Sequence, residues 1–392
     1  MTLSARTKVS AALPVFPWDT LADATATARA HPDGIVDLSV GTPVDDVAPV
    51  IREALAAASA SPGYPTTAGT PAVRASAVAA LQRRYGVTDL PEHAVLPVIG
   101  TKEVIAWLPT LLGLGAADTV VVPELAYPTY DVGARLAGAQ VLRADSLTQI
   151  GPQVPALVYI NSPSNPTGKV LTMDEWQKLF ELSDRYGFVI AADECYSEIY
   201  FDDAHLPIGG LEAATRLGRS DFRNVVMFSS LSKRSNVPGM RSGFVAGDAA
   251  ILKRFLLYRT YHGCAMSPSV QAASAAAWND EAHVAENRRQ YREKFAVITP
   301  MLKAHLDVDL PDAGFYLWAR VSGLGVSDTE FARRLQAEYN VTVLPGSFLA
   351  REAHGVNPGA GFVRIALVAD LAECVEAASR IATFAQQLSN NP

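Results

Sequence analysis

Short apolar runs recur along the chain and alternate with longer stretches whose apolar positions follow a helical spacing. Several short runs are apolar at consecutive positions, which is typical of strands buried on both faces of a sheet. The expected strands are Ile35–Val40, Thr119–Pro123, Ala156–Asn161, Phe188–Glu194, Asn224–Ser230 and Gly243–Gly247. Expected helices between them include Lys102–Leu112, Asp174–Tyr186 and Ala249–Tyr261. This alternation predicts an α/β fold with a mostly parallel central sheet flanked by helices.

The pattern changes after about residue 280. A long charged helix, expected over Glu281–Leu306, is followed by the apolar segments AGFYLWARV, VTVLPG and GFVRIALV and by a terminal helix from Ala369. These elements predict a smaller α+β domain. We therefore expect an N-terminal arm over residues 1–34 that joins the small domain, a large domain over 35–280, and a small C-terminal domain over 281–392.

Composition narrows the class of protein. The 392 residues are 49% hydrophobic and 19% charged, which indicates a globular protein with more than one ordinary core. A net charge of −7 without a long run of one sign argues against nucleic acid or an anionic membrane as the main partner.

Cysteine and histidine usage points to a cytoplasmic protein without a metal site. The three cysteines, Cys195, Cys264 and Cys374, lie far apart, and the seven histidines form no HxxxH or HExxH pair. The N-terminal stretch lacks an apolar core of signal-peptide length, and no 18-residue apolar run occurs.

Polar residues gather just beyond the expected strands, where open α/β sheets bind their ligands. The stretch SSLSKRSNVPGMRSG, Ser229 to Gly243, sets a lysine and an arginine behind one strand. The other strand ends, and the start of the helix near Glu103, supply further polar groups: Asn161, Ser164, Asn165, Thr167, Asp193, Glu194, Tyr196 and Gly100–Lys102. An acid, amides, hydroxyls and two cations are thus predicted to converge on one edge of the sheet.

This set has a chemical logic. Lys233 can form a Schiff base with an aldehyde cofactor and then move protons. Arg241, the Ser230 hydroxyl and the backbone N–H groups after Gly100 would hold a phosphate. Asp193 would keep a pyridine nitrogen protonated so that the ring accepts electrons. Together these groups predict pyridoxal 5'-phosphate as the cofactor.

Three more residues complete the expected ring environment. Tyr196 and Asn165 can hydrogen-bond the phenolic oxygen of the cofactor, and Tyr127 can stack on its face.

At this point the sequence resembles a known family. SLSKRSNVPGMRSG, SPSNPTG and DECY resemble the class I/II pyridoxal-phosphate aminotransferases of fold type I. The resemblance extends from VGTP at Val40 through SPGYPTTAGTP and PELAYPTY to VRIAL at Val363. It implies amino-acid and 2-oxo-acid substrates, and it makes the large domain the cofactor-binding one.

The resemblance also implies a role for each matching position. Lys233 is the lysine that binds the cofactor, Asp193 is the pyridinium partner, and Asn165 and Tyr196 contact the phenolic oxygen, with Asn165 also near the substrate. Tyr127 is the stacking ring. The phosphate contacts are Thr101 and Lys102, both through backbone N–H groups, together with Ser230 and Arg241.

Substrate and partner contacts follow from the same resemblance. Arg364 binds the substrate α-carboxylate, with the Gly41 backbone beside it. Tyr64 is contributed to the phosphate of the partner subunit, which implies a homodimer with active sites at the interface.

A finer resemblance concerns the substrate. The wording SSLSKRSNVPGMRSGFVAGD and the segments VFPWD, VGTP and YPTTAGTP are similar to actinobacterial N-succinyldiaminopimelate aminotransferases of lysine and cell-wall precursor synthesis. This implies amino transfer between N-succinyl-LL-2,6-diaminopimelate and 2-oxoglutarate. Aspartate, alanine or aromatic aminotransferases and a fold-type-I C–S β-lyase are the alternatives. A DNA-binding regulator is disfavoured, because only about 35 residues precede the first expected strand and they are not notably basic.

Several positions allow a plain structural interpretation. Asp193 could cap a helix, and the NPTG segment around Asn165 could be only a turn. Arg364 lies in the apolar run FVRIAL, where a structural Asp or Glu is an alternative partner to a substrate carboxylate. Cys195 is expected to fill the core rather than act as a nucleophile.

The distal end of the substrate is the least determined part of the site. Arg259, Lys102 and backbone amides are the candidates for holding it. Four aromatic residues could line the substrate entrance or pack in the core: Phe16, Trp18, Phe315 and Tyr316.

Overall fold

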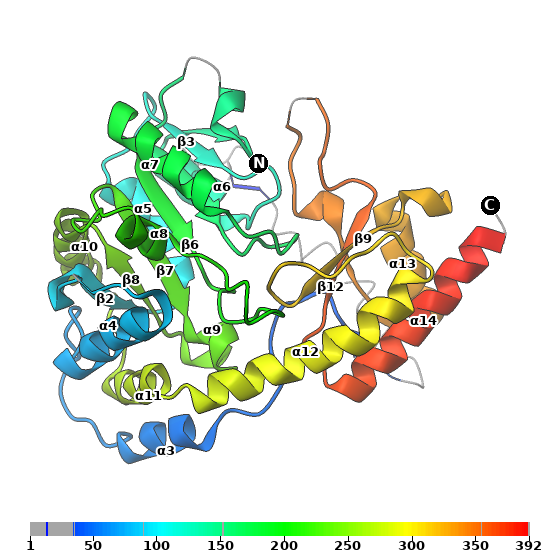
Figure 1. Ribbon diagram of the computed structural model, residues 1–392, viewed down its shortest axis with the longest axis horizontal. Helices are drawn as coiled ribbons and strands as arrows, with labels where there is room; N and C mark the ends of the chain where they lie inside the picture. The colour runs from blue at the N-terminus through cyan, green and yellow to red at the C-terminus, as the bar shows by residue number, and fades with distance from the viewer. Residues whose placement is uncertain are drawn as a thin grey trace, which may run out of the picture.

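The computed structural model describes residues 13–14, 34, 36–88, 90–150, 153–353 and 355–390. A large body and a smaller one lie side by side, and helix α12 (Ala282–Lys303) runs from one to the other (Figure 1). Of the predicted N-terminal arm, only residues 13, 14 and 34 are described, and Phe16 and Trp18 lie outside the described residues.

A seven-stranded sheet forms the centre of the large body, in the order β2-β8-β7-β6-β5-β3-β4. Strand β8 runs antiparallel to both of its neighbours, and the other pairs are parallel. The strands are β2 (Val95–Val98), β3 (Thr119–Val122), β4 (Gln140–Arg143), β5 (Leu157–Asn161), β6 (Val189–Asp193), β7 (Val225–Ser230) and β8 (Gly243–Gly247). The predicted mostly parallel α/β sheet is therefore confirmed.

Helices flank this sheet, and several of them begin or end at residues that commonly cap helices. Helix α7 starts at a capping box formed by Thr172 and Glu175 and ends at Gly187, whose φ is 79°. The helices of the large body are α3 (Pro49–Ala57), α4 (Pro71–Tyr85), α5 (Thr101–Leu111), α6 (Thr129–Leu136), α7 (Met173–Tyr186), α8 (Gly210–Arg216), α9 (Leu231–Arg234), α10 (Ala249–His262) and α11 (Pro268–Asn279).

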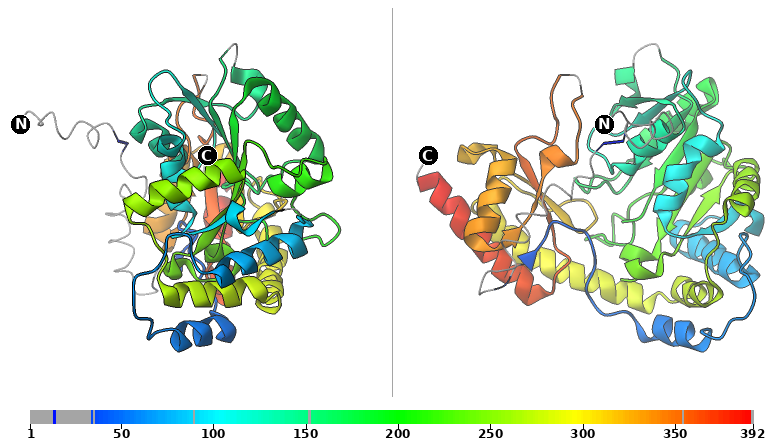
Figure 2. Two further views of the ribbon diagram at one scale, coloured as in Figure 1. Left: turned by 90° about the vertical axis from the view of Figure 1, so that its left-hand side faces the viewer. Right: turned by 180° about the vertical axis from the view of Figure 1, so that it is seen from behind.

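The smaller body contains a three-stranded antiparallel sheet with helices packed against it (Figure 2). The sheet has the order β11-β12-β9, and a separate hydrophobic cluster that includes Phe315, Phe331 and Ile365 forms its core. The elements are β9 (Tyr316–Arg320), α13 (Asp328–Tyr339), β10 (Val341–Thr342), β11 (Leu344–Pro345), β12 (Phe362–Ala366) and α14 (Leu371–Asn390). This is the predicted small α+β unit.

One expected strand joins a different sheet. Within the described part of the expected run Ile35–Val40, residues 36–40, only Val36–Asp37 forms a strand, β1, and it pairs in parallel with β10 rather than with the large sheet. The Asp37 carboxylate then accepts hydrogen bonds from the backbone and hydroxyl of Ser39, which turns the chain. The domain boundaries at residues 35 and 281 stay a prediction.

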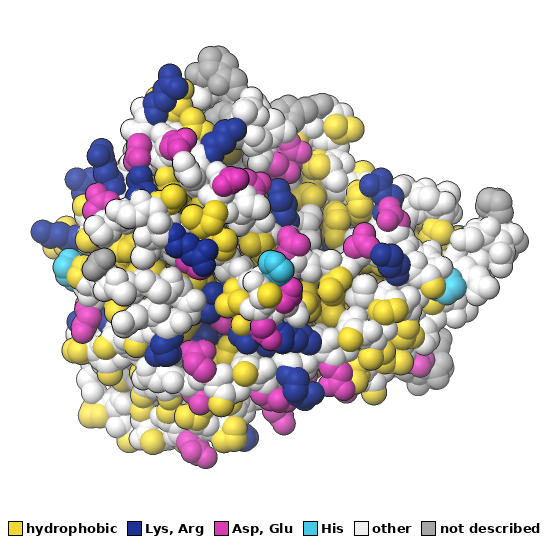
Figure 3. Space-filling view, viewed as in Figure 1, with side chains coloured by type: hydrophobic (Ala, Val, Ile, Leu, Met, Phe, Trp, Pro, Cys, Tyr) yellow, Lys and Arg dark blue, Asp and Glu magenta, His cyan; other side chains and the backbone are white. Residues whose placement is uncertain are grey.

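The surface is mixed in charge. Lys and Arg side chains are interspersed with Asp and Glu over the face seen in Figure 3. Within the described part of the chain, no helix is both long and apolar enough to cross a membrane.

Candidate functional site

Three of the predicted site residues lie at the carboxyl ends of three adjacent strands. Asp193 ends β6, Asn165 follows β5, and Lys233 follows β7 on the short helix α9. The sheet register sets Asn161 opposite Asp193 and Asp193 opposite Phe228, so these strand ends are level. The polar residues that follow them therefore share one edge of the sheet.

Lys233 is held as a largely buried amine. Its Nζ donates to the carbonyl of Gly41 and lies 5.1 Å from the ring centroid of Phe315. Burial, together with the positive charges of Arg364 and Arg241, lowers the pKa of Lys233 to about 8. An appreciable fraction of this amine is thus uncharged near neutral pH, the form in which it is a nucleophile.

Asp193 is a buried carboxylate without a cationic partner. Its oxygens accept from the Tyr130 hydroxyl at 2.7 Å and from the backbone N–H of Cys195 at 3.3 Å. Burial raises the pKa of Asp193, although these hydrogen bonds oppose the shift. Among the described residues it forms no ion pair. It precedes turns rather than a helix, so the interpretation as a helix cap is wrong.

Arg364, on β12, is a second buried charge without a counter-ion. The residue is 1% exposed, and its guanidinium donates to Asn165 Oδ1 at 2.8 Å and to the Ser39 carbonyl at 2.6 Å. Its Nε has no hydrogen-bond partner, and no described Asp or Glu pairs with it. The structural acid considered for this arginine is therefore not found among the described residues.

Two tyrosines that contact each other lie beside Arg364. The Tyr196 and Tyr316 hydroxyls lie 3.1 Å apart, and the Arg364 guanidinium lies 4.2 Å from the centroid of the Tyr316 ring. A β-carbon on Gly41 would overlap the Tyr316 hydroxyl, so only glycine fits at this position. Phe315 and Tyr316 are both buried in the core of the smaller body. Burial favours a packing role for Phe315 over a place at the substrate entrance, whereas the Tyr316 hydroxyl also makes the polar contact with Tyr196.

The start of α5 and the Arg241 side chain form a candidate phosphate site. Gly100, with φ of 82°, precedes the helix and supplies no side-chain cap, so the first N–H groups at Thr101 and Lys102 point outward. The Arg241 guanidinium occupies the space that a β-carbon on Gly100 would need. Backbone donors and a cation thus face the same place. Ser230 lies at the end of β7 and bonds to Ser232 at 2.8 Å.

The remaining predicted residues differ in whether a single chain brings them to the site. Tyr127 is half-buried, meets Tyr130 edge to face, and has the Lys102 ammonium 5.6 Å from its ring centroid. Tyr64 is fully exposed, so a single chain does not bring it to the site. The pKa of the Cys195 thiol is raised by burial, and its Sγ lies 3.3 Å from the Thr101 hydroxyl.

Arg259 is wrong as a candidate for binding the distal end of the substrate. It is buried and donates to both carboxylate oxygens of Glu103, at 2.5 and 3.3 Å. Its third nitrogen donates to the carbonyls of Pro97 and Thr67. All donor atoms of this guanidinium are used inside the protein.

Three contributors escaped the sequence interpretation: Ser39, Tyr130 and the hydroxyl of Tyr316. Ser39 lies 325 residues from Arg364, Tyr130 lies 63 from Asp193, and Tyr316 lies 120 from Tyr196. No local motif signals such pairs. Tyr130 ends the segment PELAYPTY, Ser39 lies in the expected strand Ile35–Val40, and Tyr316 was a candidate for the substrate entrance, but none of these observations predicts the partner that each residue contacts.

Comparison with known proteins places the chain in a family. Residues 33–381 match the family model described as aminotransferase class I and II. The chain is 56% identical over 366 residues to the probable aminotransferase Rv1178 of Mycobacterium tuberculosis, covering 93% of this chain and 84% of that protein. It is 43% identical to the 4-dedimethylamino-4-oxo-anhydrotetracycline transaminase OxyQ of Streptomyces rimosus, covering 94% and 99%.

Solved structures of aminotransferases have the same fold as this chain. An aminotransferase from Neisseria meningitidis superposes with a TM-score of 0.88 at 44% identity, covering 96% of this chain and 99% of that one. A probable N-succinyldiaminopimelate aminotransferase from Thermus thermophilus gives a TM-score of 0.82 at 30% identity, covering 94% and 100%. The chain belongs to the class I and II aminotransferases, a family of fold type I that uses pyridoxal 5'-phosphate.

The residues present fit that cofactor. A buried carboxyl without a counter-ion suits a protonated ring nitrogen, and Arg241 above an uncapped helix start suits a phosphate. A lysine whose pKa is about 8 suits an aldehyde.

Proposed function

We propose that this aminotransferase exchanges an amino group between N-succinyl-LL-2,6-diaminopimelate and 2-oxoglutarate, giving the succinylated 2-amino-6-oxo acid and glutamate. The resemblance of its motifs to enzymes of that class supports the choice of substrate, as does the likeness to the Thermus thermophilus structure. Both substrates carry a carboxylate beside the carbon that gains or loses nitrogen. The site therefore needs an anion-binding group close to the reacting amine.

The unpaired guanidinium of Arg364 is the observation that carries this proposal. A buried charge without a counter-ion is costly, and a carboxylate ligand would remove that cost. Arg364 touches the carbonyl of Ser39, and Lys233 touches that of Gly41, two residues along the same loop. The same short loop therefore contacts both the guanidinium that would bind the carboxylate and the amine that would act on the neighbouring carbon.

The pyridoxal phosphate, when bound, supplies the electron sink for the reaction. We assign Lys233 to bind its aldehyde, to remove the α-proton of the substrate and to return it to the cofactor carbon. Asp193 keeps the ring nitrogen protonated. Tyr196 and Asn165 bind the phenolic oxygen, and Tyr127 covers the ring face. The phosphate is assigned to Ser230, Arg241 and the N–H groups of Thr101 and Lys102.

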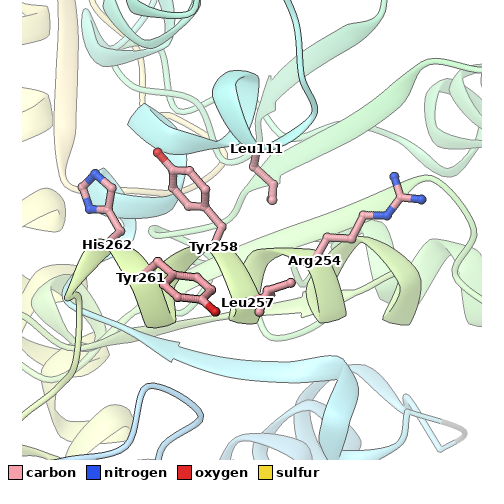
Figure 4. A pocket seen from close by; sticks show the side chains of 6 residues that line it. All are labelled: Leu111, Arg254, Leu257, Tyr258, Tyr261 and His262. Carbon is pink, nitrogen blue, oxygen red and sulfur yellow. The ribbon is translucent and has the colours of Figure 1, made fainter.

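A homodimer forms part of the same proposal. Five side chains of α10, Arg254 among them, and Leu111 of α5 line a mostly apolar surface pocket (Figure 4). Leu257 and Tyr261 in this pocket are 61% and 87% exposed. A second copy of the chain covering this face would let Tyr64 reach the phosphate of its partner. Leu257→Asp is then expected to give monomers with weakened cofactor binding, measured by light scattering and cofactor titration.

Single-turnover absorbance on the cofactor-loaded protein tests the substrate. Glutamate, aspartate, alanine and N-succinyl-diaminopimelate are offered one at a time, with Lys233→Ala as the control. Rapid conversion of the cofactor to its amine form by glutamate and the succinylated substrate alone supports the proposal. Equal conversion by several small amino acids contradicts the substrate and leaves the aminotransferase. Product release without the amine form of the cofactor indicates a lyase.

A further inference from the structure

The helix that carries Lys233 is tied to α12 by one side chain. Helix α9 has only four residues, so most of its carbonyls find no partner within it. The side-chain amide of Asn287, on α12, donates to the carbonyls of Lys233 and Arg234 at 3.0 and 3.1 Å. Asn287 thus satisfies two consecutive carbonyls at the end of the helix that presents the amine.

The orientation of this amide is fixed. Asn287 is 5% exposed, and its Oδ1 has no hydrogen-bond partner among the described residues. Turning the amide over would set that oxygen against two carbonyl oxygens. A buried acceptor without a donor destabilises the folded protein. Asn287 nevertheless keeps the orientation in which its amide donates to both carbonyls.

Neighbouring contacts hold the same stretch from the same side. His283 Nε2 lies 2.8 Å from the Ser235 hydroxyl, and Arg234 donates to the Ala277 carbonyl at 2.8 Å. These bonds fix the residues after Lys233, whereas Asn287 reaches the backbone of Lys233 itself.

Helix α12 leads from this contact toward the smaller body (Figure 1). Further along α12, the Lys294 ammonium pairs with the Asp45 carboxylate at 2.8 Å. Asp45 lies four residues after Gly41, and the carbonyl of Gly41 accepts a hydrogen bond from the Lys233 amine. One helix therefore holds both the backbone of Lys233 and the segment that its amine contacts.

We propose that Asn287 is a positioning residue for transamination, whose amide fixes the backbone of Lys233 and so keeps its amine at the reacting atoms. This inference rests on the proposed role of Lys233. It assigns Asn287 an effect on the proton-transfer steps and none on the carboxylate contacts of Arg364 and Asn165.

The test is a graded series at position 287 in the cofactor-loaded enzyme. Asn287→Ala is expected to lower kcat about 10- to 100-fold, because a displaced amine misaligns the proton transfer. KM for both substrates is expected to stay within about twofold, since the carboxylate contacts are intact. Asn287→Ser, which keeps one donor, should recover part of the loss, and Asn287→Asp should be worst because its carboxylate opposes the carbonyls.

Arg288→Gln is the matched control. Arg288 is the next residue of α12, and it donates to the backbone and carboxylate of Glu198 instead of α9. The Arg288→Gln substitution should lower the unfolding temperature of the enzyme, while its kcat should stay within about twofold of the parent value. Equal kcat losses in Asn287→Ala and Arg288→Gln, or a rise in KM with kcat unchanged, would overturn the inference. If the alanine variant does not fold, the serine and parent proteins decide the same comparison.

A second readout separates this inference from the proposed function. Borohydride reduction of each loaded protein, followed by peptide mass mapping, identifies the lysine that holds the cofactor, and cofactor titration gives its affinity. Labelling at Lys233 in every variant, with weaker cofactor binding in Asn287→Ala, supports both assignments. Labelling elsewhere in the parent contradicts the role of Lys233. Labelling at Lys233 with kcat unchanged across the series contradicts the role of Asn287 alone.

Discussion

Arg259 and Arg364 are equally buried, each 1% exposed, yet they stand in opposite surroundings. Arg259 faces the Glu103 carboxylate and two backbone carbonyls, and its donors are all used. Arg364 contacts an amide oxygen, one carbonyl and the face of Tyr316, and its Nε has no hydrogen-bond partner among the described residues. The first is a closed ion pair, and the second is a cation that lacks an anion.

The difference shows that burial alone does not separate an arginine paired inside the protein from one that could bind an anion. A buried charge whose partner lies within the protein contributes to the fold, and removing one partner strands the other. A buried charge without a partner is retained at a cost to stability, which a bound anion can offset. The distinction between Arg259 and Arg364 lies in their neighbours, not in the residue or its depth.

Replacing Arg364 gives the largest expected effect on catalysis. Arg364→Met should lower kcat/KM for α-amino acids by roughly 1000-fold, about 4 kcal/mol, because the carboxylate loses a charged partner. The free energy of unfolding should stay level or rise, since an unpaired charge leaves the core. Steady-state kinetics and urea unfolding measure the two. A large loss of stability with kcat/KM preserved would make Arg364 a structural arginine like Arg259.

Replacing Arg259 should have the converse result. Arg259→Met is expected to lower the free energy of unfolding by about 3 kcal/mol, because it leaves the Glu103 carboxylate buried and unpaired. Urea unfolding checks this, with the double variant Arg259→Met, Glu103→Gln as the control that removes the stranded charge. The double variant should recover most of the stability. If it is no more stable than the single variant, the ion pair is not the cause.

The amine of Lys233 extends the comparison to a third buried cation. Its pKa of about 8 in the folded protein lies below the ordinary 10.5, so between these values the unfolded chain binds more protons. Stability of the cofactor-free protein should therefore rise with pH across that window. Lys233→Met should be more stable at pH 7 by less than about 3 kcal/mol, and the gain should vanish by pH 11.

Urea unfolding at several pH values measures this difference. A gain that is the same at pH 7 and pH 11 would mean that packing, rather than the buried charge, causes it.

The smallest expected effect concerns the hydroxyl of Tyr316. Tyr316→Phe keeps the ring beneath Arg364 and removes the 3.1 Å contact with Tyr196. A single neutral hydrogen bond contributes about 1 kcal/mol, so kcat/KM should fall roughly fivefold. Tyr316→Leu, which also removes the ring, should cost clearly more. Equal losses in the two variants would show that the ring face does not support Arg364.

Much of the large sheet was predictable because its buried strands are apolar at consecutive positions. Strands β2 and β4 were not expected: VLPV is short and contains Pro97, and QVLR is partly exposed. The apolar pattern of Ile35–Val40 resembles that of the strands of the large sheet, although β1, which lies in this run, pairs with β10 of the smaller body. Apolar patterns indicate that a strand is buried, and they do not indicate which strand it joins.

The candidate site was predictable only where its residues follow strands or belong to motifs. Lys233, Asp193 and Asn165 follow strand ends, and the sheet register brings them to one edge. Whether Arg364 or Arg259 had an internal counter-ion depends on residues that are distant in the sequence. Glu103 lies 156 residues from Arg259, and that pairing is set by the packing of α5 against α10.

The pairing of β1 with β10 has a consequence for biosynthesis. Val36 pairs with Val341, so the segment leading to Ser39 and Gly41 has no strand partner until about 300 further residues have been made. At about 5–20 residues per second, the ribosome takes roughly 15–60 s to supply it. The strand that anchors the loop whose carbonyls meet Lys233 and Arg364 can therefore pair only after Val341 has been made. Every strand of the large sheet is made before the strand that pairs with β1.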